Sequence, residues 1–295
     1  MPGFYRHIAA CNPPLHEVFL PWRIDGRIVG WVRPAFAGEL RRFADVFIVD
    51  ASAVTLAPTL RDFAGRSAAL VAIAQDLGGR GVTPPYMDEP YAVTAAGRDD
   101  AVCVIDRAAA AHFGVRSFGQ HLNGYVRRDD GIHMWVGRRA RDRLLFPGAL
   151  DNMVAGGLPY GVALHDNLAK ECAEEAGVAV ETARRAVPVG AISYSRVARR
   201  GLRRDVLYCY DLELPVDFVP RNTDGEVEEF MLLPIRKVAA IVRDTDEFKL
   251  NCNLVIIDFL IRHGLLEPHS DEYLDLVLGL RQPLKGPEHV PDVIA

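Results

Sequence analysis

The segment "GGLPYGVALHDNLAKECAEEAGV", residues 156–178, constrains the fold and chemistry of this chain more than any other feature. A loop with three glycines and a proline leads into a run of helix formers that ends at Gly177, a residue type that commonly follows a helix. At 3.6 residues per turn, Glu171, Glu174 and Glu175 lie on one face of that helix. The apolar residues lie on a different arc: Leu168, Ala169, Cys172 and Ala176. We therefore expect a helix anchored to a sheet, with its acidic face left open.

Three neighbouring carboxylates on one helix face repel one another. Each like-charge pair at this spacing costs a few tenths of a kcal/mol, roughly, and Lys170 offsets only part of that cost through Glu174. A solvated helix face is the competing interpretation, because helices rich in glutamate are common. A hard divalent cation would resolve the repulsion, since Mg²⁺ prefers oxygen ligands such as carboxylates. The preceding glycine loop favours the metal site.

This segment resembles the Nudix box, G-x5-E-x7-R-E-U-x-E-E-x-G-U with U aliphatic, without gaps over residues 156–178. The matching positions are Gly156, Glu171, Cys172, Glu174, Glu175, Gly177 and Val178. Two positions depart: Val162 stands where the signature has its first glutamate, and Lys170 replaces the arginine. Lysine keeps the positive charge but loses the two-pronged donor geometry, and valine removes a carboxylate.

The resemblance implies a loop and helix on a mixed-sheet α/β/α sandwich, in an enzyme that hydrolyses a diphosphate linked to another group. It implies Mg²⁺ or Mn²⁺ bound by Glu171, Glu174 and Glu175, with Glu174 also catalytic. It also implies that Gly156, Lys170 and Gly177 have structural roles in the box.

In the Nudix family a further glutamate late in the domain often completes the metal shell or activates water. The stretch "TDGEVEEF" supplies candidates, of which we favour Glu226 as a catalytic residue, with Glu228 or Glu229 as alternates. Strand alternation would place Glu226 and Glu228 on one side and Glu229 on the other. The competing interpretation is that these are charges protecting an exposed strand edge.

A narrower resemblance covers more of the chain. The stretches "GQHLNGYV", "WVGRRA", "FPGALDNMVAGGLPYG" and "FKLNCNLVIIDFLIRHG" are similar to a Nudix subgroup with an extra N-terminal domain, related to the Nudix part of fungal thiamine pyrophosphokinase fusions and to plant homologues. The subgroup shares the departure at Val162. The resemblance implies a diphosphatase acting on thiamine diphosphate or its oxidised analogues, which releases the monophosphate and phosphate.

Three other functions remain open. One is a nucleoside-diphosphate-X pyrophosphohydrolase, and another is a non-catalytic ligand sensor on the same fold, although the E-x-x-E-E cluster is intact here. The third is an isomerase of the isopentenyl-diphosphate branch, which would need a catalytic Cys and Glu in contexts that this sequence lacks.

Four residues outside the box are candidates for substrate binding. Arg138 and Arg139 would hold substrate phosphates, Tyr160 would stack on a heteroaromatic ring, and Asn123 would line the pocket. Surface solvation and structural packing are the competing interpretations for each of them.

Along the chain, the pattern predicts an α/β (α+β) protein in three parts. Residues 1–115 form a smaller α/β accessory domain, because strand-like runs alternate with a long helical pattern around residues 60–78 and a short strand leads into a helix that stops at Gly114. Residues 116–270 form the Nudix domain, which begins with a hairpin turning at "DDG" and ends with a helix around "NCNLVIIDFLIRHG". Residues 271–295 are a C-terminal tail.

The composition and charge of the chain argue against some classes of binding partner. A net charge of -5 and a pI near 6.0 disfavour a nucleic-acid partner. No apolar run approaches the roughly 20 residues needed to cross a bilayer. Five scattered cysteines without a C-x-x-C pair fit reduced thiols. We therefore expect a cytoplasmic protein that acts on a small-molecule diphosphate, away from membranes and nucleic acid, with a homodimer left open.

Overall fold

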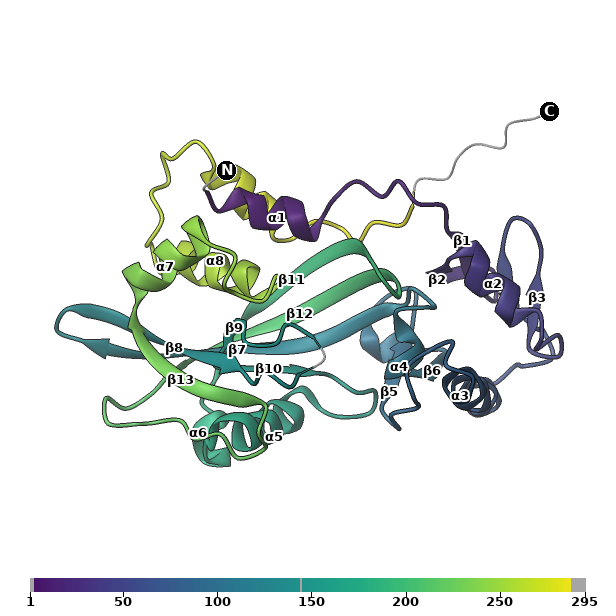
Figure 1. Ribbon diagram of the computed structural model, residues 1–295, viewed down its shortest axis with the longest axis horizontal. Coiled ribbons are helices and arrows are strands. Elements are labelled where there is room, and N and C mark those ends of the chain that lie inside the picture. The colour runs from purple at the N-terminus through teal and green to yellow at the C-terminus, as the bar shows by residue number, and fades with distance from the viewer. Residues whose placement is uncertain (1–2, 144, 288–295) are drawn as a thin grey trace.

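The computed structural model describes residues 3–143 and 145–287. Its main feature is a seven-stranded mixed sheet with helices on both faces, beside a smaller N-terminal unit that comprises residues 20–115 (Figure 1). Within the described residues, no helix has the length and apolar character to span a membrane.

The strand order of the large sheet is β11-β12-β7-β8-β13, with β10 beside β7 and β9 beside β8. Strands β7 and β12 are parallel and the other pairs are antiparallel, so the sheet is mixed as predicted. The strands are β7 (Arg116–Arg128), β8 (Gly131–Arg139), β9 (Leu150–Asn152), β10 (Val154–Gly157), β11 (Val187–Ala198), β12 (Gly201–Glu213) and β13 (Val227–Pro234).

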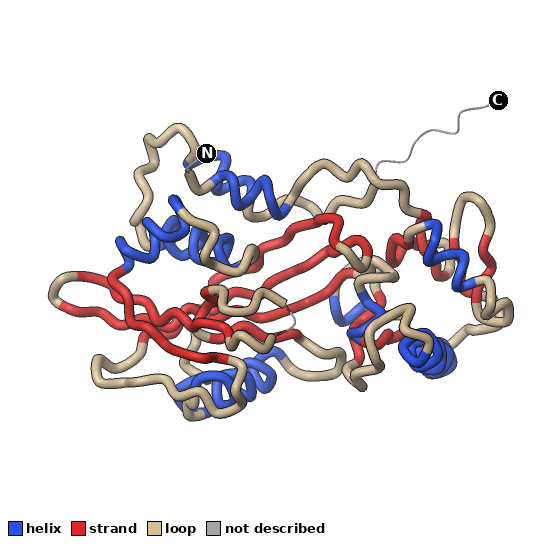
Figure 2. Tube along the Cα trace, viewed as in Figure 1, coloured by secondary structure: helices blue, strands red, loops and turns tan. Residues whose placement is uncertain are grey.

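Helices cover the two faces of this sheet (Figure 2). On one face lie α5 (Leu164–Ala176) and α6 (Val180–Ala183); on the other lie α1 (Tyr5–Cys11), α7 (Ile235–Asp244), α8 (Cys252–Arg262) and α9 (Tyr273–Gly279). The predicted α/β/α sandwich is therefore confirmed.

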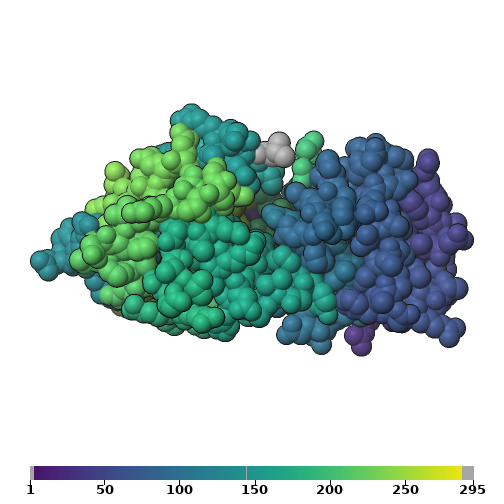
Figure 3. Space-filling view, turned by 90° about the horizontal axis from the view of Figure 1, so that it is seen from below, coloured from purple at the N-terminus to yellow at the C-terminus, as the bar shows by residue number. Residues whose placement is uncertain are grey.

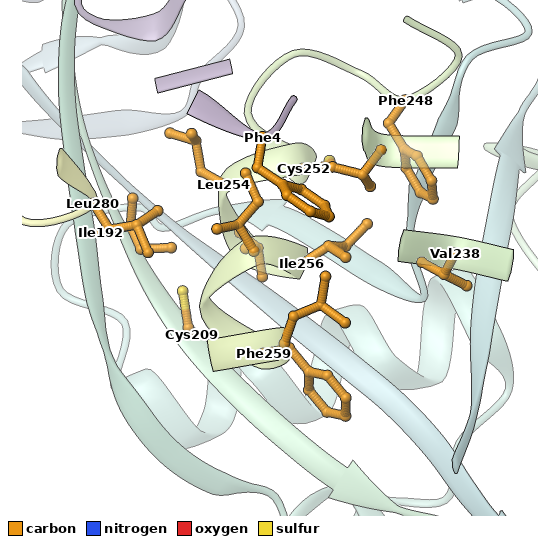
Figure 4. Close-up of a cluster of buried hydrophobic side chains, with 14 of the residues drawn as sticks. Phe4, Ile192, Cys209, Val238, Phe248, Cys252, Leu254, Ile256, Phe259 and Leu280 are labelled. Carbon is orange, nitrogen blue, oxygen red and sulfur yellow. The ribbon is translucent and has the colours of Figure 1, made fainter. Parts of the chain in front are cut away.

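The core on the α8 face joins both ends of the described chain. Phe4 and Ile8 from the α1 end pack with Phe259 of α8 and with Leu276 and Leu280 around α9 in one buried cluster (Figure 4). The division at residues 115 and 270 remains a proposal, since α1 and α9 both pack on the large sheet. Residues 288–295 of the proposed tail lie outside the described residues.

The N-terminal unit has a core of its own, built around Trp22, Phe36 and Phe113. Its four-stranded sheet has the order β2-β1-β4-β3, and β5 and β6 form a separate antiparallel pair. The elements are β1 (Leu20–Ile24), β2 (Arg27–Val32), α2 (Pro34–Leu40), β3 (Phe47–Val49), β4 (Val54–Leu56), α3 (Phe63–Gly79), β5 (Pro90–Val93), a 3-10 turn η1 (Arg98–Asp100), β6 (Cys103–Asp106) and α4 (Arg107–Ala110).

Local sequence signals predicted several of these elements. The hairpin at "DDG" is confirmed, with Arg128 opposite Gly131. The long N-terminal helix is confirmed as α3, which begins after Asp62, whose side chain accepts a hydrogen bond from the Gly65 amide. The helix predicted to stop at Gly114 instead ends at Ala110. The chain then turns to pair with β2, where the Trp31 amide donates to the Phe113 carbonyl.

Candidate active site

The box helix α5 is fixed by local capping and by its apolar arc. It ends at Ala176; the capping residue Gly177 has a left-handed φ of 62°, and the Val178 amide donates to the Cys172 carbonyl. The apolar residues predicted to anchor the helix are all buried: Leu168, Ala169, Cys172 and Ala176. The helix and its anchoring are therefore confirmed.

The three box glutamates differ in their burial. The Glu174 side chain is 50% exposed and that of Glu171 is 17% exposed, whereas Glu175 is buried. The Glu175 carboxylate accepts a hydrogen bond of 3.0 Å from the Ala155 amide. The expectation of an open acidic face is therefore wrong for Glu175, because α5 packs its side chain against β10.

Burial changes the protonation of these carboxyls. The pKa of Glu175 is raised to about 8, first by burial and then by the charges of Asp151, Glu171 and Glu226, against the lowering effect of the Ala155 amide. The pKa of Glu171 is also raised, mainly by burial, while the charge of Lys170 opposes the shift. Without a bound cation, burial therefore favours the protonated, neutral forms of these two carboxyl groups.

Gly156 allows Glu171 to approach the end of β10. A Cβ atom at position 156 would lie 2.5 Å from the Glu171 Cδ atom and 2.6 Å from its Oε2 atom, distances that real Cβ atoms essentially never show. The glycine at this box position therefore leaves room for a carboxylate. On the exposed side of the helix, Lys170 lies 3.3 Å from Glu174 and 3.8 Å from Glu171.

Of the three late glutamates, Glu226 is the one whose charge acts on the box. It contributes to the raised pKa of both Glu171 and Glu175, and it forms an ion pair of 2.7 Å with Arg143. The alternates pair with surface arginines: Glu228 with Arg141 at 3.5 Å and Glu229 with Arg138 at 3.8 Å. A register shift between Val227 and Glu229 interrupts the alternation expected from the sequence.

A buried polar network lies beside the carboxylates. Asp151 accepts from Arg139 at 3.0 Å and from Lys249 at 3.1 Å through Oδ2, and from the Cys252 thiol at 2.7 Å through Oδ1. Potential ligand atoms of His121, Asp151 and Cys252 lie within 4.8 Å of one another. The two neighbouring cations oppose a metal ion at this point, so we interpret these residues as a hydrogen-bonded network.

The protonation states in this network support that interpretation. Burial lowers the pKa of His121 to about 4 and raises the pKa of the Cys252 thiol well above its usual value. The pKa of Asp151 is lowered because Lys249, His121, Cys252 and Arg139 together outweigh the effect of burial. His121 is therefore neutral and Cys252 a thiol near neutral pH, whereas a metal-bound cysteine is a thiolate.

The predicted substrate residues do not gather in one place. Arg139 joins the Asp151 network, and Arg138 donates to the Gly148 carbonyl at 3.1 Å. Tyr160 packs on Phe63 of the N-terminal unit, with ring centroids 5.3 Å apart. Asn123 is buried and bonds to Asn152 and Asp211, the latter an ion-pair partner of Arg262 in α8. Asn123 thus lies on the α8 face, across the sheet from α5.

Sequence reasoning missed Asp151, Lys249 and Cys252. Asp151 lies only five residues before Gly156. A single aspartate in an extended stretch, however, has no sequence pattern that indicates a functional role. Lys249 and Cys252 reach the site from 98 and 101 residues further along the chain. Nothing in their local pattern indicates that contact.

The box carboxylates fit a hard divalent cation. Their donors are oxygens, and Glu175 is buried without an ion-pair partner among the described residues. Glu171, Glu174 and Glu175 would hold such an ion, which would favour their charged forms.

Comparisons with known proteins cover both parts of the chain. A family model described as a domain of unknown function, DUF4743, matches residues 3–117. The chain is 43% identical over 290 residues to "Nudix hydrolase 20, chloroplastic" of Arabidopsis thaliana, covering 95% of this chain and 78% of that protein. It is 44% identical over 283 residues to "Nudix hydrolase 24, chloroplastic" of the same plant, with the same coverage.

A solved structure also matches part of the chain. A MutT/nudix family protein from Enterococcus faecalis is 14% identical, with a TM-score of 0.41, over 55% of this chain and 67% of that one.

A mixed-sheet sandwich that carries this acidic box helix defines a class of hydrolases acting on diphosphate bonds. With relatives this similar over nearly its whole length, the chain belongs to the Nudix hydrolase family. It is a hydrolase acting on phosphorus-containing anhydrides of small molecules.

Proposed function

We propose that the chain is a Mg²⁺- or Mn²⁺-dependent diphosphatase whose cation is held by Glu171, Glu174 and Glu175. The observation that supports this most is the position of these carboxylates around the buried Glu175, next to the space that Gly156 leaves. When bound, the divalent cation neutralises charge on the diphosphate oxygens and lowers the pKa of the attacking water.

The remaining steps fall to side chains around the box. Glu226 takes a proton from the attacking water, and its ion pair with Arg143 keeps its carboxylate in place. Arg139 and Lys249, which both pair with Asp151, bind substrate phosphate oxygens and orient the diphosphate. Arg138 and Tyr160 remain candidates for contacts with the rest of the substrate.

For the substrate we propose thiamine diphosphate or its oxidised analogues, cleaved to the monophosphate and phosphate. The resemblance to the subgroup with an extra N-terminal domain supports this choice. A nucleoside-diphosphate-X substrate is the alternative, and a non-catalytic sensor is the second. The isomerase alternative is disfavoured, because all five cysteines are buried and burial raises the thiol pKa of Cys172 to about 12.

Phosphate release from a panel of thiamine and nucleoside diphosphates, with and without Mg²⁺, tests the proposal. We expect metal-dependent turnover of at least one thiamine-type compound. Glu174→Gln should lower kcat by about 100-fold or more, because a lost metal ligand removes about 3 kcal/mol of transition-state stabilisation. Equal binding of a diphosphate with no metal-dependent turnover would contradict the enzyme and indicate a sensor.

Location and assembly belong to the same proposal. We propose a cytoplasmic enzyme without a nucleic-acid partner, although the names of the two plant relatives place those proteins in the chloroplast. Cell fractionation tests the location, and light scattering of the purified protein decides between a monomer and a homodimer.

A further inference from the structure

The N-terminal unit contacts the loop that precedes the box helix. We call residues 156–163, from the end of β10 to the start of α5, the box loop. The Tyr160 amide donates to the Pro90 carbonyl at 2.7 Å, and Arg98 donates to the Pro159 carbonyl at 2.9 Å. Leu158 is buried in a cluster with Ala92 of β5. Figure 3 shows the two surfaces in contact, with the box segment in teal and the N-terminal unit in blue.

Gly157 lets this contact become unusually close. A Cβ atom at position 157 would lie 2.4 Å from the Tyr91 hydroxyl and 3.3 Å from a Glu89 carboxylate oxygen. The neighbouring Gly156 admits Glu171 in the same way. Two consecutive glycines therefore accept side chains from two parts of the chain, one from the box helix and one from the N-terminal unit.

Glu89 brings a carboxylate from the N-terminal unit to the box. Its Oε1 atom would lie 3.3 Å from a Cβ atom at Gly157, one residue from the glycine that admits Glu171. Glu89 is held by an ion pair of 2.8 Å with Arg107, and its side chain is only 24% exposed. Glu89 therefore places a carboxylate against the box loop from a distant part of the chain.

We propose that the N-terminal unit completes the diphosphatase site, with Glu89 as a positioning residue that, held by Arg107, fixes the box loop beside Glu171 for metal binding. This inference rests on the proposed metal site. It gives the domain of unknown function a direct role in the chemistry of the enzyme. Residues that orient metal ligands typically change metal affinity or activity about 10- to 100-fold when they are removed.

Binding of Mn²⁺ to the full chain, measured by calorimetry without substrate, tests the role of Glu89. We expect Glu89→Gln to weaken Mn²⁺ binding about 10-fold and to lower kcat more than it changes KM. Glu89→Asp, which keeps the charge, should recover part of the affinity. The matched control is Glu39→Gln, which removes a carboxylate from another 2.8 Å ion pair of the N-terminal unit, with Arg80, and should leave Mn²⁺ binding unchanged.

A second set of variants tests the contact itself, even if Glu89→Gln folds poorly. Gly157→Ala should weaken Mn²⁺ binding, because the new methyl group meets the Tyr91 hydroxyl. Adding Tyr91→Phe should restore binding, because the nearest ring carbon would then lie at an ordinary 3.5 Å. Thermal unfolding of each variant reports whether the fold is kept.

Two results would overturn the inference: wild-type Mn²⁺ affinity in a folded Glu89→Gln variant, or equally weak binding in Gly157→Ala with and without Tyr91→Phe. If the wild-type chain hydrolyses no diphosphate, the proposed function fails. The Mn²⁺ measurements, which need no substrate, still decide the role of Glu89.

Discussion

Gly156→Ala is expected to lower kcat for metal-dependent diphosphate hydrolysis by about 100-fold while the protein stays folded. The added methyl group would stand 2.5 Å from the Glu171 Cδ atom, so the carboxylate has to move by several tenths of an ångström or more. A misplacement of about 1 Å in a catalytic group can cost about 100-fold in rate. Steady-state kinetics with saturating Mg²⁺ measures the effect, and Mn²⁺ titration shows whether the metal site is weakened.

A glycine elsewhere in the chain provides the control for this substitution. Gly38 lies in α2, and a Cβ atom there would meet nothing within 4 Å. Gly38→Ala should keep wild-type kinetics and leave stability unchanged or slightly higher, since alanine favours a helix more than glycine does. Wild-type turnover by Gly156→Ala would show that catalysis does not need Glu171 at its observed position. It would then exclude Glu171 as a metal ligand.

The box could be recognised from sequence because its information is local. Spacing along one helix places the glutamates on one face, and the same spacing selects the apolar residues that bury the helix. Gly177 ends the helix in the left-handed conformation that glycine adopts readily. Each of these signals lies within 23 residues of chain, from Gly156 to Val178.

The surroundings of the box could not be predicted in the same way. Glu175 looks like its neighbour Glu174 in the sequence, and only the packing of α5 against β10 separates a buried carboxyl from an exposed one. Lys249 and Glu89 approach from the C-terminal and N-terminal sides of the chain, respectively. Such contacts form only when the whole sheet is assembled. The residue pattern of a single strand or helix does not indicate which distant segments will meet there.

Contacts with distant segments also explain why the predicted substrate-binding residues do not lie together in the structure. Tyr160 was chosen for its aromatic ring, yet its ring packs on Phe63, so it serves the contact between the N-terminal unit and the box loop. Asn123 is predicted from the sequence to line the pocket, yet its side chain bonds to Asn152 and Asp211. A polar or aromatic residue type indicates what a side chain can bind, but neighbours from distant segments decide what it does bind.

Without a divalent cation, the unfolding free energy is expected to fall as the pH rises from about 4.5 to about 8, and Glu175 is the cause. Its pKa is raised from an ordinary 4.5 to about 8 in the folded protein, so the folded state holds a proton that the unfolded state releases. Stability is greatest below pH 4.5 for this group and is lost as the pH rises through 8. The full effect is about 5 kcal/mol, at about 1.4 kcal/mol per pH unit.

Denaturant unfolding of the wild type and Glu175→Gln, at several pH values in chelator and in Mn²⁺, isolates this contribution. The amide oxygen of glutamine can still accept from the Ala155 amide but carries no charge, so Glu175→Gln should be more stable than the wild type at pH 8 in chelator. Mn²⁺ should remove that difference by stabilising the wild type, since an ion that binds only the folded state shifts the equilibrium toward it.

Glu181→Gln, which removes an exposed carboxylate from α6, should follow the wild-type profile. Parallel pH profiles for the wild type and Glu175→Gln would show that burial does not hold a proton on Glu175 in the folded protein.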